Sequence, residues 1–155
     1  MNGLFFINIS LFRTIIIAFI YLLSLWGCSE YSEEVQANLT KLKKTKACSG
    51  CDLTGVELIS FDLKNADLSG SNLTGANLSR VDLTEANLTN ANLTDANLVM
   101  SILTSAKLVN TNLSGVKLSY ANLSGVDISD SLLVDASMNS SKILNSKISD
   151  TNMTG

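Results

Sequence analysis

The chain has 155 residues and a formal net charge of −3, from 11 basic and 14 acidic side chains, and it contains no histidine. This modest charge is ordinary for solubility and does not point to a particular partner. Without histidine the chain lacks the most frequent general base, and three cysteines are too few for a four-ligand zinc site within one chain.

The N-terminal residues predict an export signal. Residues 14–26 form an apolar run after Arg13 that is too short to span a bilayer comfortably, so we expect a signal peptide over residues 1–27. Leu25, Gly27 and Cys28 resemble the cleavage box of bacterial lipoproteins, which implies lipidation of Cys28. Because Ser29 and not an aspartate follows, the resemblance implies an anchor in the outer membrane, facing the periplasm. A secreted protein or an uncleaved membrane anchor are the alternatives.

Residues 28–50 are expected to form a lipid-anchored linker and a short capping helix. Ser32 is a suitable N-cap, and Val35, Leu39 and Leu42 recur at a helical spacing. The favoured interpretation is a helix that covers the element after it and exposes its lysines to solvent. In the alternative, the lysines contact anionic lipid headgroups. Those lysines are Lys41, Lys43, Lys44 and Lys46.

Cys48 and Cys51 enclose Ser49-Gly50, a spacing that suits half a zinc site, a redox pair or a disulfide. No second pair is present to complete a zinc site, and a thioredoxin-type role needs a βαβ context that this sequence lacks. In an oxidising compartment we interpret the two cysteines as a structural disulfide. No metal or cofactor is expected.

A five-residue repeat occupies the rest of the chain. From Leu53 to Met153, all 21 positions spaced by five are Leu, Ile or Met. Steps of five scatter around an α-helix and alternate between the faces of a straight strand, so neither element gives one buried face. The repeat suits a chain that turns a corner in every unit and points its leucines inward. Representative predicted core residues are Leu53, Leu73, Leu93, Leu113 and Leu133.

The units Ala66-Asp67-Leu68-Ser69-Gly70 and Ala86-Asn87-Leu88-Thr89-Asn90 resemble those of pentapeptide-repeat proteins. The resemblance implies an all-β fold, a right-handed quadrilateral β-helix with four pentapeptides in each coil. Over residues 51–155 it gives about five coils.

A patch of apolar residues is the best candidate for function. Stacking at twenty-residue intervals places Met100 between Arg80 and Tyr120, with Val99 and Ile102 nearby. An apolar cluster on a polar surface is typical of a contact site, and the alternative is that these are the scattered apolar residues that any protein surface carries. On the first interpretation we predict a non-enzymatic protein-interaction or structural module at the cell envelope, with an unidentified partner. Catalysis is not expected, because the Ser and Thr hydroxyls lack an adjacent base and a filled core leaves no deep pocket.

Two other functions, DNA mimicry and ice binding, and the formation of a homodimer are further hypotheses. Some pentapeptide-repeat proteins imitate DNA and occupy the DNA site of a topoisomerase, but here acids concentrate in residues 51–100 and lysines interrupt the rest, so no nucleic-acid partner is expected. A regular hydroxyl face resembles ice-binding solenoids in outline. We also expect a homodimer through the C-terminal coil, which no closing helix follows. The hydroxyl face consists of Thr54, Thr74, Thr94 and Ser114 beside Asn72, Asn92 and Asn112.

Overall fold

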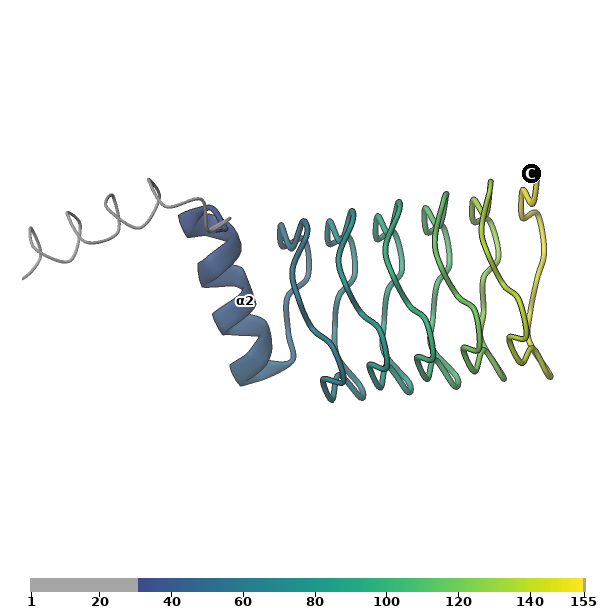
Figure 1. The fold of residues 1–155 in the computed structure, drawn as a ribbon, viewed down its shortest axis with the longest axis horizontal. Coiled ribbons are helices and arrows are strands. Elements are labelled where there is room, and N and C mark those ends of the chain that lie inside the picture. The colour runs from purple at the N-terminus through teal and green to yellow at the C-terminus, as the bar shows by residue number, and fades with distance from the viewer. Residues whose placement is uncertain (1–30, 155) are drawn as a thin grey trace, which may run out of the picture. The chain divides into compact units, whose positions relative to one another are not determined.

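The computed structural model describes residues 31–154, so the predicted signal peptide and Cys28 lie outside the described residues. The described part consists of helix α2, Glu33–Thr45, and a stack of coils that follows it (Figure 1). Within residues 31–154, no helix has the length and apolar character needed to cross a bilayer.

Each coil pairs in parallel with the next at a separation of twenty residues. The bridges run from Ala47 with Asp67 to Leu132 with Asn152, and the coils are evenly stacked (Figure 1). The backbone bonds are short: Leu73 N–H donates to the Asn92 carbonyl at 2.7 Å. A twenty-residue coil of five-residue units has four sides, which agrees with the predicted β-helix. Each side contributes a single bridging residue and no extended strand, because a turn follows at once.

A two-residue turn makes each corner. Val56 N–H donates to the Leu53 carbonyl at 3.3 Å and closes the turn through Thr54 and Gly55. Gly55 has a φ of 66°, the positive value that a type II turn requires at its second central residue. Positive φ values recur at this position in every repeat through Asp150. The alternation of a short side and a tight turn therefore winds the chain into a coil.

The outward Asp or Asn of a repeat stabilises the turn after it. Asp67 Oδ1 accepts hydrogen bonds from the Ser69 N–H at 3.1 Å and the Ser69 hydroxyl at 2.7 Å. Asn92 Oδ1 accepts the same pair from Thr94, at 3.1 and 2.6 Å. Such local bonds explain the preference for Asp or Asn at this position and for Ser or Thr two residues later.

The five representative leucines fill the interior of the coils. Leu53, Leu73 and Leu93 are 0% exposed, Leu113 is 1% exposed and Leu133 is 4% exposed. Ala and Val at the other inward position complete this core. Burial ends in the last described coil, where Ile148 and Met153 are 44% and 50% exposed because no described coil lies over them.

Helix α2 covers the first coil with its buried residues Val35, Leu39 and Leu42. The Asn38 side-chain amide donates to the Asp52 carbonyl at 3.1 Å, which joins the helix to the coil. The Lys43 ammonium lies 5.9 Å from the centre of the Phe61 ring. These residues show why an amphipathic helix precedes the repeats: it shields the apolar end of the stack from water.

Cys48 and Cys51 are joined by a disulfide, and both side chains are buried. The β-helix was predicted to start at residue 51, but in the structure its coils already begin at Ala47. The reason is that Cys48 already holds a core position, and its N–H donates to the Asp67 carbonyl at 2.7 Å.

Candidate functional site

One corner of the solenoid carries large side chains where the backbone favours small ones. The second turn residue has a positive φ, which suits Gly, Asn and Asp best. Arg80, Met100 and Tyr120 occupy this position with φ values of 58°, 59° and 61°, and their twenty-residue spacing places them on one corner. Almost all other described residues with a positive φ are Gly, Asn, Asp or Ser, and only Lys46 and Glu85 are not. The conformation costs roughly 1–2 kcal/mol for each such residue, so the turn itself does not favour them.

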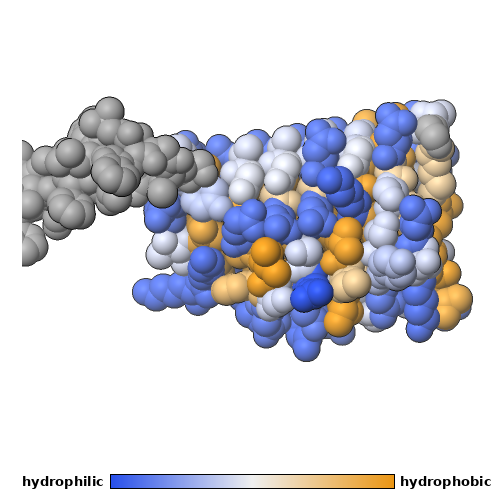
Figure 2. Space-filling model, viewed as in Figure 1, coloured by the Kyte–Doolittle hydropathy of each residue, from blue (hydrophilic) through white to orange (hydrophobic). Residues whose placement is uncertain are grey.

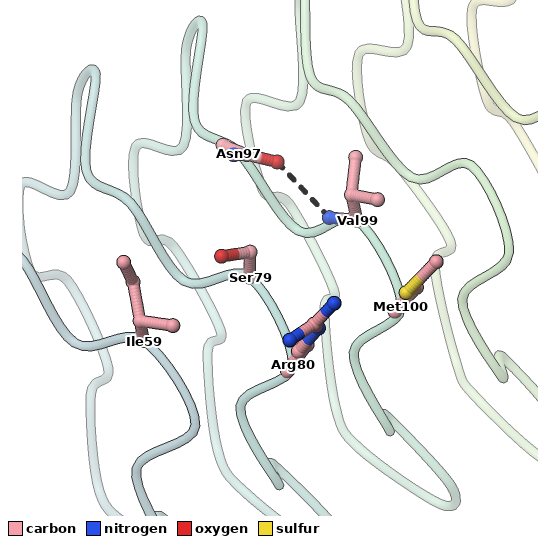
Figure 3. Close-up of a pocket in the computed structure, with 6 residues that line it drawn as sticks. All are labelled: Ile59, Ser79, Arg80, Asn97, Val99 and Met100. Carbon is pink, nitrogen blue, oxygen red and sulfur yellow. Dashed lines mark hydrogen bonds between the residues drawn. The ribbon is translucent and has the colours of Figure 1, made fainter.

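Val99 and Ile102 also depart from the residues that stabilise the repeat. Asn97 Oδ1 accepts the Val99 N–H at 3.1 Å (Figure 3), but valine has no hydroxyl to donate the second bond that Thr or Ser supplies elsewhere. Ile102 replaces an outward Asp or Asn and is 40% exposed, so it cannot accept a hydrogen bond from the following turn. Both residues exchange a stabilising bond for apolar surface.

A shallow pocket of about 440 Å³ lies at this corner. Arg80 lies between Ile59 on one side and Met100 on the other, and Ser79 is next to it (Figure 3). Ile59 is 52% exposed and Met100 is 48% exposed, so the walls are apolar and accessible. The complete lining consists of Ile59, Ser79, Arg80, Asn97, Val99 and Met100. We call this set the corner pocket.

The predicted patch and the corner pocket overlap in part. Arg80, Val99 and Met100 line the pocket, whereas Ile102 and Tyr120 do not. Both of the latter are exposed and extend the apolar surface beyond the pocket. On the face seen in Figure 2, apolar side chains interrupt a mostly hydrophilic surface in the middle of the stack and again toward its C-terminal end.

The repeat pattern alone did not single out Ile59, Ser79 and Asn97 as lining residues. Ile59 had a detectable signal, because isoleucine occupies a turn position that is Ser or Thr in most repeats. Ser79 and Asn97 follow the repeat consensus, so only their place next to Arg80 distinguishes them.

The carboxylates that the repeat places next to this corner already form hydrogen bonds and ion pairs. Asp62 accepts the Lys64 N–H at 3.0 Å and pairs with the Lys46 ammonium at 3.1 Å, and these bonds lower its pKa. Burial raises the pKa of Asp82, but hydrogen bonds from Thr84 and Lys64 outweigh that effect, so the net shift is downward. Both side chains therefore stay ionised to low pH and already have cationic partners.

Arg80 differs from these paired groups. None of the ion pairs within residues 31–154 involves its guanidinium. The Asn77 side-chain amide donates to Glu57 Oε2 at 2.8 Å, so this nearby carboxylate is also hydrogen-bonded. Among the described residues, the guanidinium thus has no ion-pair partner.

Residues 31–154 contain no group of three or more acidic, Cys or His side chains placed to hold a metal ion. On the hydroxyl face, some hydroxyl groups already form hydrogen bonds within the chain: Thr54 donates to Asp52 at 2.6 Å and Thr74 donates to Asn72 at 2.7 Å. The arrangement supports binding through shape, apolar contact and one cation. Cys28, the predicted lipidation site, lies outside the described residues.

A regular four-sided coil with an apolar, arginine-bearing corner defines a β-solenoid with a surface suited to binding. The pentapeptide-repeat family model matches eight copies, within residues 48–84, 62–98, 103–133 and 118–155. The chain therefore belongs to the pentapeptide-repeat family, a class for which no enzymatic activity is indicated.

The chain is similar to several pentapeptide-repeat proteins of known structure. A pentapeptide repeat protein from Nostoc PCC 7120, alr5209, is 22% identical with a TM-score of 0.51, over 69% of this chain and 93% of that one. The pentapeptide repeat protein Rfr23 from Cyanothece 51142 is 28% identical with a TM-score of 0.46, over 72% and 97%. Full-length QnrB1, a plasmid-mediated fluoroquinolone resistance protein, is 19% identical with a TM-score of 0.40, over 63% and 57%. No curated protein matches the sequence.

Proposed function

We propose that this pentapeptide-repeat solenoid is an exported, lipid-anchored interaction module that binds a protein partner at the cell envelope through the corner pocket and its apolar extension. The observation that carries the proposal is the row of Arg80, Met100 and Tyr120 in strained turn positions. Arg, Met and Tyr are enriched in protein interfaces, whereas the repeat favours Gly, Asn or Asp there. A binding role accounts for residues that the fold does not require.

Export and anchoring rest on the sequence of the N-terminal segment. Several acyl chains on Cys28 would hold the protein at the outer membrane more durably than one chain, and the coils would face the periplasm. A Cys28→Ser variant should leave the membrane fraction, and mass spectrometry of the parent should find the acylated cysteine. An unprocessed cytoplasmic parent would contradict this part of the proposal.

Photo-crosslinking tests the binding surface directly. A photoreactive residue at position 100 should capture a discrete protein in cells that produce this chain. The matched control is position 110, an exposed residue with positive φ half a coil away in the same stack. Equal capture at both positions, or none at position 100, would contradict a partner at this corner.

DNA mimicry is less well supported by the outward columns. Beyond Asp62 and Asp82, the same column continues with Ile102, Asn122 and Lys142. A surface that imitates DNA needs regularly spaced negative charge, and this column loses its charge after two coils and then reverses sign.

The assembly proposed with this function is a homodimer through the C-terminal coil. In that coil Ile143, Leu144, Ile148 and Met153 are between 36% and 53% exposed. Their apolar surface and the unpaired backbone of the last described coil can be covered together by a second copy.

A further inference from the structure

We propose that the corner pocket binds an extended segment of a partner protein in which one Asp or Glu lies beside a large apolar residue. This inference rests on the proposed function and specifies the chemistry of the partner. The Arg80 guanidinium forms no ion pair within residues 31–154, whereas the neighbouring Asp62 and Asp82 are paired with lysines.

An external carboxylate satisfies this guanidinium best. The planar guanidinium binds a carboxylate through two parallel hydrogen bonds, which gives both direction and strength. Next to it, the Ser79 hydroxyl takes part in none of the hydrogen bonds of the described residues. In the equivalent position the hydroxyl of Thr94 donates to the preceding Asn. Ser79 can therefore add a donor beside Arg80 in the same pocket.

The walls of the pocket require an apolar group next to that carboxylate. Ile59 and Met100 are about half exposed on either side of Arg80 (Figure 3), and Val99 extends the apolar wall. Covering them removes apolar surface from water. A wholly apolar ligand would instead desolvate Arg80 without pairing it, which is unfavourable.

The charges around the pocket select against ligands with many negative groups. Lys46 and Lys64 already pair with Asp62 and Asp82 on the side that follows this corner, so further negative groups of a ligand would meet engaged lysines together with their carboxylates next to Arg80. A single carboxylate can bind Arg80 and avoid them. This distribution favours one acidic side chain in a mostly apolar sequence over phosphate-rich surfaces or polyacidic segments.

The geometry of the corner suits an extended chain. Ile59 and Met100 belong to coils two apart, a separation of about 10 Å at the usual spacing between strands. Three residues of extended chain span about 10 Å. A segment of three to five residues that runs along the stack therefore contacts both apolar walls and Arg80 together.

Selection from a random heptapeptide display library on the full-length chain, purified in detergent, tests this inference. Enriched peptides should share an Asp or Glu adjacent to Leu, Ile, Phe or Met. Their affinity should fall about tenfold or more for Arg80→Met, as expected for the loss of a charged hydrogen-bonded pair. Arg80→Lys should retain part of the affinity, because it keeps the charge and loses the planar fork.

Lys107→Met is the matched control, since it removes an exposed cation that forms no ion pair among the described residues and lies on another side of the coil. It should leave affinity unchanged, and melting curves should show that all variants fold. Enriched peptides that are wholly apolar or polyacidic, that bind Arg80→Met as well as the parent, or that do not emerge at all, would overturn the inference. Capture at position 100 in cells would then still support the proposed function.

Discussion

At the scale of single residues, each position of the repeat has its own physical task. Leu93 is fully buried, Asn92 accepts two hydrogen bonds from Thr94, and Asp95 adopts the positive φ of the turn. A departure from the repeat therefore loses a definite contribution. Arg80 and Met100 occupy turn positions whose positive φ favours smaller residues, which is why we propose that they serve binding.

Truncation of one inward leucine should destabilise the whole stack. Leu93→Ala leaves a cavity between two filled coils, and we expect a loss of about 2–5 kcal/mol in the free energy of unfolding. Leu93→Met conserves volume and should cost less than about 1.5 kcal/mol. Urea denaturation measures both. An alanine variant as stable as the parent would contradict a closely packed interior.

Acid should weaken the turns that aspartates stabilise. The hydrogen bond from the Ser69 hydroxyl, with that from the Ser69 N–H, lowers the pKa of Asp67 below its usual 3.8. The folded state thus binds this proton less readily than the unfolded state. The stability it contributes is complete above the unfolded pKa, near 4, and disappears as the pH falls through the lower folded value.

Asp67→Asn should remove that dependence. The amide keeps the acceptor Oδ1 but does not titrate. The melting temperature of the Asp67→Asn variant should therefore fall less than that of the parent between pH 5 and pH 2. Asp67→Ala has no acceptor and should be less stable than the parent at neutral pH. Parallel curves for the parent and Asp67→Asn would show that the aspartate does not act through its charge.

At the scale of elements, helix α2 and the first coil form one packed unit. The helix residues Val35, Leu39 and Leu42 are buried, and Asn38 joins the helix to the Asp52 carbonyl. In solenoids each repeat contacts only its neighbours, so an end needs a cap and the effect of the cap is local. This agrees with the covering helix favoured by the sequence.

Loss of the helix contact should therefore loosen one end of the stack first. In Leu42→Ala, the amides of residues 51–70 should exchange with deuterium faster, while those of residues 91–110 change little. Leu42 is fully buried, whereas Lys41 is exposed, so Lys41→Ala is the matched control and should resemble the parent. Uniform acceleration along the chain would indicate that the helix contributes to global and not to local stability.

At the scale of the molecule, the two ends of the stack differ. The N-terminal end is covered by α2, whereas the C-terminal coil exposes Ile148 and Met153. The apolar residues of this coil and of the corner pocket lie at different places on the stack, so the proposed dimer contact and the proposed partner site are separate surfaces.

Light scattering on the full-length chain tests the proposed homodimer. We expect twice the mass of one chain at micromolar concentrations and a single-chain mass for Ile148→Lys, because a charge in the apolar contact is unfavourable. Asn110→Lys, exposed on another corner, should remain dimeric. A parent with the mass of one chain at all these concentrations would contradict the dimer.

Most of the fold follows from the sequence because a strict five-residue period admits few backbone paths. The inward position of Leu93 and the presence of a capping helix before the repeats were predictable, since burial and periodicity are local signals. The start of the winding at Ala47 was less evident: Cys48 stands at the inward position five residues before Leu53, but it is not a leucine, and the first coil is defined by backbone pairing with Asp67 in the next coil.

The candidate site shows the same division. Sequence spacing predicted that Arg80, Met100 and Tyr120 share a corner, because stacked coils repeat every twenty residues. Three features became apparent only in three dimensions: the pocket with Ile59 and Ser79, the absence of an ion pair to Arg80 among the described residues, and the positive φ of the large residues. Period and burial act along the chain, whereas the lining of a pocket and the pairing of a charge depend on which side chains from neighbouring coils meet.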